Sequence, residues 1–389
     1  MKSEQMDILI YCQHVLGVGH LFRTLLIAEA LRAHRVTLIL GGPSAPFAHG
    51  DHIRVVHLPG LQMDAAFSSL LPTESGRTLE EVKQLRREQL FTIMRDCQPD
   101  VLMIELFPFG RNGFSFELMP MLEAIRAGKL PPCRVACSLR DILVEKENPQ
   151  KFEQRVIDRL NSLFDALLIH ADANVIALDA TFSRVGDIAI PTVYTGYVAE
   201  QVNHEQAKAL RQKLALAAEE KLIVVSAGGG NVGKELLTAA LDAHAELRFP
   251  ARMQIFTGPY LDAASFLSLE SRNLPGVSIS RFADDFSSWL GAADLSVSMG
   301  GYNTVMNILA AGTPALIFPF HQNREQRMRA ERLRPLANLA VLDEKDLVPA
   351  LLADKITGMI HRAKKPASIR LDGAEFTSRW LSQWAAEDR

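Results

Sequence analysis

Short apolar runs alternate with longer amphipathic stretches along the whole chain. The runs are rich in Val, Ile and Leu, as strands are when helices cover both faces of a parallel sheet. This pattern predicts the α/β fold class, with two doubly wound, Rossmann-like sets of strands. The first half contains runs at 7–12, 35–40, 53–58, 100–106, 133–139 and 165–170, and the second half at 221–227, 251–258, 276–280, 293–299 and 314–319.

The stretches between the runs indicate where the domains divide. We expect a first domain at 1–195 and a second at 220–370. A linker is expected at 196–219, and the hinge is expected in the stretch from Pro191 to about Glu220, where a turn-like PTVYTGY gives way to a polar, Ala-rich helix. A final helix is expected at 371–389, and it must dock on another element because aromatic residues share one of its faces: Phe376, Trp380 and Trp384. The segment 61–95 shows no strand pattern and is expected to be a loop followed by a charged helix.

Composition narrows the range of functions. The 389 residues are 48% apolar and 22% charged, which predicts well-formed cores. Because 42 Lys and Arg stand against 45 Asp and Glu, the net charge of −3 provides no basic field for nucleic acid. We find neither a signal-peptide pattern nor an apolar run of roughly 20 residues. We therefore expect a cytoplasmic protein, and peripheral contact with the inner face of the membrane stays open.

A glycine-rich turn follows the first predicted strand. In HVLGVGHLF, Gly17 and Gly19 precede a helix, and Phe22 stands where a dinucleotide fingerprint has its third glycine. His20 comes at the carboxyl end of the strand, where open sheets bind ligands, and an imidazole suits a general base. A plain turn from strand to helix is the alternative interpretation.

Two charged residues follow the strand at 100–106. Glu105 is positioned to orient His20 or to bind an acceptor hydroxyl, and a buried structural carboxylate is equally consistent with the pattern. Arg111 suits pairing with an anionic acceptor, with a surface salt bridge as the alternative.

A second glycine-rich turn, SAGGGNVGKELL, lies between the strand at 221–227 and a helix. It satisfies Gly-x-Gly-x-x-Gly literally. However, the next strand ends in Thr257 and Gly258 instead of the acidic residue that a dinucleotide needs for its ribose, which disfavours a nicotinamide or flavin cofactor. Phosphate binding stays consistent with the turn, through Gly229, Gly230 and the side chain of Asn231.

The third constellation runs from 281 to 333. The strand at 293–299 ends in Gly300 and Gly301, and Asn303 and Thr304 then open a helix whose N-terminus suits a diphosphate. A further strand leads into PFHQNREQ, which brings two side chains to the same rim: Glu325 and Gln326. Ordinary helix capping and a surface charge cluster are the alternative.

This segment resembles the nucleotide-sugar half of GT-B glycosyltransferases, most closely the MurG-type enzymes and related bacterial glycosyltransferases. The GVGH turn, the GGGNVG turn and the aromatic final helix are also similar, and the resemblance is dense over about 220–333. It implies two Rossmann-like domains facing across a cleft, with the final helix returning to the first domain.

The resemblance also implies a function. It predicts transfer of a sugar from a UDP-sugar, such as UDP-N-acetylglucosamine, by inverting displacement with His20 as base. By the family pattern, the backbone at Phe282 and Ala283 reads the nucleobase, Gly300, Gly301, Asn303 and Thr304 hold the diphosphate, and Glu325 and Gln326 meet the donor sugar. The sequence contains no Asp-x-Asp, so neither a metal ion nor a cofactor is expected.

One residue departs from the family pattern. Asn307 stands where the family carries a Glu that binds the ribose hydroxyls, which keeps acceptor capacity but loses the charge. A non-catalytic nucleotide-sugar-binding protein therefore stays as an alternative. A nucleotide-sugar epimerase or hydrolase is the other alternative, because sugar-nucleotide 2-epimerases share this architecture. The acceptor also stays open between a lipid, a polysaccharide, a protein and a small molecule.

Overall fold

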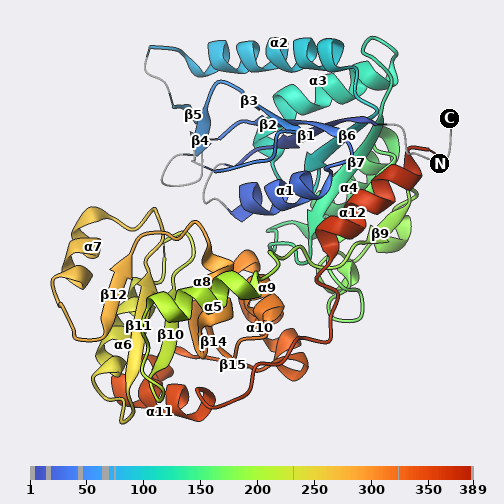
Figure 1. Cartoon of the computed structure of the whole chain (residues 1–389). Coiled ribbons are helices and arrows are strands. Elements are labelled where there is room, and N and C mark those ends of the chain that lie inside the picture. Colours follow the sequence, from blue (N-terminus) through green and yellow to red (C-terminus); the bar gives the residue numbers. More distant parts are fainter. Residues whose placement is uncertain are drawn as a thin grey trace. The chain divides into compact units, whose positions relative to one another are not determined.

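The computed structural model describes residues 5–14, 19–42, 47–63, 70–73, 76–230, 232–322 and 324–386. The chain forms two units, Met1–Val198 with Asp372–Arg389, and Ala199–Leu371. Each unit is built on a parallel sheet covered by helices (Figure 1). The α/β class predicted from the apolar runs is confirmed. Among the described helices, none is long and apolar enough to cross a membrane.

The sheet of the first unit has the strand order β3-β2-β1-β6-β7-β8-β9, and each strand is parallel to its neighbours. Helices α1 and α12 lie on one side of it and α2 and α3 on the other (Figure 1). The strands are β1 (Asp7–Cys12), β2 (Arg35–Leu40), β3 (Ile53–His57), β6 (Val101–Glu105), β7 (Arg134–Arg140), β8 (Ala166–His170) and β9 (Thr192–Tyr194). The helices are α1 (Gly19–Ala30), α2 (Leu79–Cys97), α3 (Ser115–Arg126), α4 (Pro149–Leu163) and α12 (Gly373–Trp384).

Three short strands of this unit were not expected. β4 (Leu61–Met63) and β5 (Leu70–Pro72) pair antiparallel where the sequence shows no strand pattern, and β9 lies in the segment expected to be a turn. Three residues are too few to establish an alternating pattern, which explains why these strands were overlooked. The charged helix expected after the loop is α2, and Thr78 and Glu81 form a capping box at its start.

The sheet of the second unit has the order β12-β11-β10-β13-β14-β15, again with parallel neighbours. Its core joins β10, β11, β13 and β14 to α6 and α11. The strands are β10 (Lys221–Ser226), β11 (Ala251–Phe256), β12 (Val277–Ser280), β13 (Leu295–Met299), β14 (Ala315–Phe318) and β15 (Leu339–Val341). The helices are α5 (His204–Lys213), α6 (Lys234–His244), α7 (Ala263–Glu270), α8 (Phe286–Ala292), α9 (Tyr302–Ala311), α10 (Arg324–Leu333) and α11 (Pro349–Met359).

The segment 196–219, expected to be a linker, is divided between the two units. Its first residues belong to the first unit, and from Ala199 onward the chain belongs to the second. Helix α5 packs on α8, and Arg211 Nη1 donates to the Ala292 carbonyl at 2.6 Å and to Asp294 Oδ2 at 2.9 Å. The polar helix of this segment is therefore part of the second unit.

Helix α12 completes the core of the first unit. It packs on α1, and Leu381 is fully buried in a cluster with residues of β1, β2 and β6. The Trp384 side chain is 8% exposed, and its ring stacks on Trp380 with 4.8 Å between centroids. The guanidinium of Arg134 lies 4.9 Å from the Trp384 ring centroid. Helix α12 therefore contributes to the stability of the unit that also contains β1.

We predict that Trp384→Ala lowers the free energy of unfolding of the first unit by about 3 kcal/mol, because truncating a buried Trp leaves a cavity. The matched control is Arg379→Ala on the same helix. The Arg379 side chain is 60% exposed, so its removal should cost less than about 0.5 kcal/mol. Urea unfolding of both variants measures the difference, and equal effects would show that α12 does not support the core.

Candidate functional site

In both sheets the strand order reverses once, and the candidate residues gather at the two reversals. In the first unit the reversal lies between β1 and β6, and in the second between β10 and β13. Open α/β sheets bind ligands at the carboxyl ends of the strands at such points. His20 follows β1 and Glu105 ends β6, while the glycines of the second unit follow β10 and β13. We describe the two places separately.

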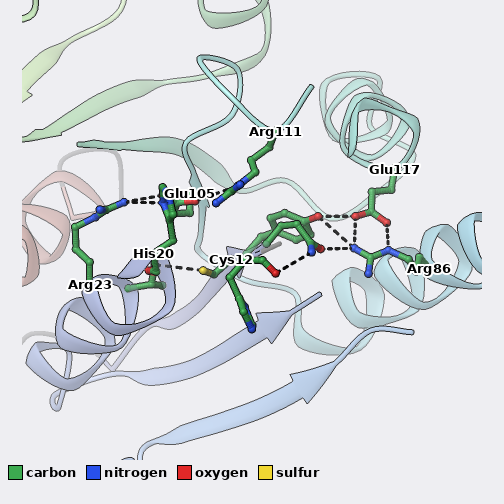
Figure 2. A network of polar contacts seen from close by, with 11 residues as sticks. Cys12, His20, Arg23, Arg86, Glu105, Arg111 and Glu117 are labelled. Atoms are coloured by element: carbon green, nitrogen blue, oxygen red, sulfur yellow. Dashed lines mark hydrogen bonds and ion pairs between the residues drawn. The ribbon is translucent and has the colours of Figure 1, made fainter. Parts of the chain in front are cut away.

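His20 and Glu105 contact each other directly. His20 Nδ1 lies 2.6 Å from Glu105 Oε1 (Figure 2). Because an ionised carboxylate only accepts hydrogen bonds, Nδ1 carries the proton and donates, which leaves the lone pair of the imidazole on Nε2. The His20 side chain is 20% exposed and that of Glu105 is 1% exposed. The imidazole is therefore partly accessible to solvent, whereas the carboxylate that it contacts is buried.

Two arginines surround the same carboxylate. Arg23 Nη2 donates to Glu105 Oε1 at 2.6 Å, and Arg111 Nε lies 3.7 Å from Oε2. Burial alone would raise the pKa of Glu105, but His20, Arg111 and Arg23 together hold it well below its usual range. Burial lowers the pKa of His20 to about 4 despite the neighbouring carboxylate. At neutral pH the site therefore holds a neutral imidazole on an ionised carboxylate, which is the state of a general base with its orienting partner.

Some polar atoms of this cluster are not satisfied within the described part of the chain. Glu105 Oε2 and the Nε and Nη2 atoms of Arg111 are buried and have no hydrogen-bond partner there. The arginine predicted on the acceptor side thus lies next to the predicted base. Buried polar groups are nearly always hydrogen-bonded in proteins, so these atoms are candidates to contact a bound molecule.

A second buried ion pair lies beside this cluster, and the sequence analysis did not single it out. Arg86 of α2 and Glu117 of α3 are both fully buried, with Nε–Oε2 and Nη2–Oε1 distances of 2.8 and 2.6 Å (Figure 2). Tyr11 donates to Glu117, and Arg86 also donates to Gln13 Oε1 at 2.7 Å. The network ties both helices to the end of β1, the strand that leads to His20.

Another histidine ends a strand of the same sheet, and it is a structural residue. His170 is fully buried, with Nε2 2.8 Å from Ser138 Oγ and Nδ1 2.9 Å from Thr195 Oγ1. Burial lowers its pKa to about 3. Both ring nitrogens have hydroxyl partners, so His170 anchors β7 and β9 to β8.

In the second unit, the glycine turn after β10 depends on close backbone approach. Gly230 has φ of 91°, and a Cβ there would lie 2.5 Å from the Thr257 carbonyl oxygen. Gly258, which the sequence analysis noted at the end of β11, would bring a Cβ to 2.4 Å from Gly229. Gly228 and Gly233 also have positive φ, 68° and 100°, so the backbone conformation of this turn accounts for the literal Gly-x-Gly-x-x-Gly pattern without a dinucleotide. Gly17 of the first turn and Asn231 of this turn lie outside the described residues.

The start of α9 lies beside this turn. Thr304 Oγ1 is 3.8 Å from the place of a Cβ on Gly228. Gly301 is the N-cap residue and makes no side-chain cap, and in the described part of the chain no heavy atom lies within 4 Å of a Cβ built on it. Asn303 and Thr304 occupy the first turn of the helix. The N-terminus of α9, the positive end of its helix dipole, therefore lies next to the turn at 228–230, with space around Gly301.

The remaining predicted donor residues differ in their surroundings. Phe282 follows β12 with 47% exposure, and Ala283 next to it is half-buried. Glu325 is buried on the first turn of α10. Gln326 Oε1 accepts from the Phe320 N–H at 3.0 Å and lies 3.2 Å from a Cβ built on Gly300.

Asn307 has an internal partner that the sequence does not reveal. Its Oδ1 accepts a hydrogen bond from the Glu200 main-chain N–H at 3.0 Å. The carbonyl oxygen expected to bind ribose is therefore engaged within the second unit.

Comparison with known proteins identifies relatives of the second unit and of the fold. Residues 222–377 match the glycosyltransferase family 28 C-terminal domain. A UDP-N-acetylglucosamine–N-acetylmuramyl-(pentapeptide) pyrophosphoryl-undecaprenol N-acetylglucosamine transferase of Haemophilus influenzae is 28% identical over 144 residues, 36% of this chain and 40% of the relative. An uncharacterised glycosyltransferase of Methanosarcina acetivorans is 22% identical over 338 residues, 81% of this chain and 80% of the relative.

The match to the Haemophilus enzyme thus spans about 40% of that relative's length. The crystal structure of Acinetobacter baumannii MurG matches with a TM-score of 0.55 and 14% identity, over 98% of this chain and 99% of that one. The predicted fold class, that of the GT-B glycosyltransferases, is confirmed, and so is the predicted resemblance to MurG-type proteins.

We predict that Arg86→Met lowers the free energy of unfolding by about 3–5 kcal/mol, because it leaves Glu117 charged and buried without its partner. The double variant Arg86→Met/Glu117→Met should recover part of this loss, since it removes both charges. As a control, Lys83→Met removes the partner of Glu80, whose side chain is 79% exposed, and should cost less than about 1 kcal/mol. Urea unfolding measures all three, and an Arg86→Met effect no larger than the control contradicts the role of the pair.

The buried histidines make stability depend on pH. His170 stays neutral in the folded protein down to pH about 3, whereas in the unfolded chain its pKa returns to about 6.5. Between these values the unfolded state binds more protons, so the free energy of unfolding falls as the pH falls. We predict that, between pH 7 and pH 4.5, the free energy of unfolding of His170→Gln falls by about 2.5 kcal/mol less than that of the wild-type protein. Urea unfolding at both pH values tests it, and equal losses in the two proteins would refute it.

Proposed function

We propose that this chain, whose residues 222–377 match a glycosyltransferase family 28 C-terminal domain, moves a sugar from a nucleotide diphosphate donor to an acceptor hydroxyl. The donor is a UDP-sugar such as UDP-N-acetylglucosamine, the nucleotide sugar in the name of the Haemophilus relative. One observation carries the proposal: in a chain with this domain, the neutral His20 is hydrogen-bonded to the buried carboxylate of Glu105 at a switch point of the sheet.

The second unit supplies the donor contacts in this proposal. The turn at 228–230 and the N-terminus of α9 offer main-chain N–H groups and a positive dipole end to the diphosphate, and Thr304 adds a hydroxyl donor. The leaving diphosphate is stabilised by these groups instead of by a metal ion. The backbone at Phe282 and Ala283 contacts the nucleobase, and Glu325 and Gln326 contact the donor sugar.

The chemical step follows from the state of His20. Its Nε2 takes the proton of the acceptor hydroxyl while the acceptor oxygen forms a bond to the anomeric carbon. The bond from that carbon to the diphosphate oxygen breaks, and the diphosphate leaves with the electron pair. Attack opposite to the leaving group inverts the anomeric configuration. The Glu105 carboxylate stabilises the imidazolium that forms, so Glu105 is a positioning and charge-stabilising residue.

The first unit supplies the acceptor contacts. The Nε and Nη2 atoms of Arg111 and the Oε2 atom of Glu105 have no hydrogen-bond partner within the described residues, so in this proposal they provide polar contacts for the acceptor next to the base. Gly19 begins α1 and allows close approach to its first turn. A lipid-linked glycan, a polysaccharide end and a small molecule each provide a hydroxyl of this kind, and an acceptor panel with one member of each class distinguishes them.

We predict that UDP and one UDP-sugar raise the melting temperature of the protein, because ligands that bind the folded state stabilise it. Thr304→Ala should weaken this shift. His20→Ala should keep it but lower the rate of UDP release with the acceptor panel by about 100-fold to 10,000-fold, the contribution of a general base. Glu105→Gln should lower the rate in the same direction by less.

His204→Ala, an exposed histidine on α5, is the matched control and should leave binding and rate unchanged. Two results would refute parts of the proposal separately. If no nucleotide shifts the melting temperature, the donor assignment fails. If His20→Ala keeps the full rate of UDP release, the assignment of the base fails.

A further inference from the structure

Glu200 is held one helical turn away from the start of α9. Thr304 and Asn307 are three residues apart on this helix, so their side chains lie on one face. Asn307 is 9% exposed, and its Oδ1 accepts from the Glu200 main-chain N–H at 3.0 Å. The contact connects residues that are 107 positions apart in the chain. Glu200 is therefore fixed beside the helix whose first turn faces the diphosphate in the proposed function.

The Glu200 carboxylate is half-buried and partly satisfied. Its side chain is hydrogen-bonded to Ser287, in the first turn of α8. Burial raises its pKa, the Ser287 hydroxyl opposes this rise, and the nearby charge of Asp285 adds to it. A carboxylate offers about four lone-pair sites, so the single hydroxyl of Ser287 leaves acceptor capacity.

Asp285, the other carboxylate near Glu200, caps helix α8. Its Oδ1 accepts from the Ser288 N–H at 3.0 Å as the N-cap of α8. Ser287 Oγ also lies 3.3 Å from this atom, and its one proton is shared between Asp285 and Glu200. Asn307 offers less acceptor capacity, because the Glu200 N–H uses one of the two lone pairs of its carbonyl oxygen and its NH₂ group only donates. Asp285 caps a helix and Asn307 has no carboxylate. Glu200 therefore has the carboxylate that is available here for a further hydrogen bond.

We propose that Glu200 is the residue that binds the ribose hydroxyls of the donor nucleotide. This inference rests on the proposed function, which puts the diphosphate at the first turn of α9 and therefore places the ribose, joined to the α-phosphate through the 5′ ester oxygen, next to it. A ribose brings two neighbouring hydroxyl donors, and a carboxylate accepts both with hydrogen bonds stronger than those of a neutral amide. Acidic residues bind ribose hydroxyls in this way in Rossmann-type sites. Glu200 thus makes the site selective for ribonucleotides over 2′-deoxyribonucleotides.

Calorimetric titration of the full chain with UDP and with 2′-deoxy-UDP tests the proposal. The wild-type protein should bind UDP about 10-fold to 100-fold more tightly than 2′-deoxy-UDP, because the latter lacks one hydrogen bond to a charged group. Glu200→Gln, which keeps the shape and removes the charge, should weaken UDP binding by at least about 10-fold. It should weaken 2′-deoxy-UDP binding by a smaller factor, because that nucleotide keeps only its 3′-hydroxyl contact to Glu200. The preference for ribose should therefore shrink.

Glu205→Gln on the exposed start of α5 is the matched control and should leave both affinities unchanged. The wild-type comparison needs no variant, so it decides even if Glu200→Gln folds poorly. Equal wild-type affinities for the two nucleotides overturn the proposal and leave the proposed function intact. So does a Glu200→Gln variant that binds both nucleotides more weakly by the same factor, because that is the result of a purely structural residue. A wild-type protein that binds neither nucleotide refutes the proposed function itself.

Discussion

The buried carboxylate of Glu105 is the group around which the polar cluster of the first unit is arranged. It is almost completely buried, and His20 and Arg23 both bind its Oε1 atom at 2.6 Å. A buried charge is stable only with such partners, since removing one leaves the other uncompensated. The strand order places it there, because β6 pairs with β1 and its last residue meets the helix that follows β1. The same strand pairing therefore builds the sheet and brings His20 and Glu105 together.

The candidate residues of the second unit differ in kind from those of the first, because they are mainly backbone groups instead of charged side chains. A proton acceptor needs a side chain with a tuned pKa, whereas a diphosphate needs several donors at short range. The glycine turn and the start of α9 provide backbone donors, and the close approach of Gly230 and Gly258 to neighbouring backbone excludes side chains from that place. The same sheet topology therefore carries a charge cluster in one unit and a backbone site in the other.

The sequence predicted the strands and helices, which follow a regular pattern of apolar residues. It did not predict the ion pairs between residues that are far apart in the chain. Buried parallel strands read as continuous apolar runs, so each expected run corresponds to a strand, and the carboxyl ends drew attention to His20 and Glu105. Arg23 was missed because it looks like any polar residue of an amphipathic helix until Glu105, 82 residues away, meets it. The buried pair of Arg86 and Glu117 was missed for the same reason: each lies in a helix whose charges appear solvent-facing.

The neutral residue at position 307 has a physical explanation once Glu200 is considered. A Glu at 307 would put a second carboxylate next to Glu200, with Asp285 already raising the pKa of that group. Like charges this close disfavour ionisation of each other. An amide instead accepts the Glu200 N–H without adding charge. Position 307 and Glu200 are therefore best considered together, because the carboxylate next to Asn307 comes from the segment before α5. Sequence comparison at position 307 alone would interpret this as a lost charge.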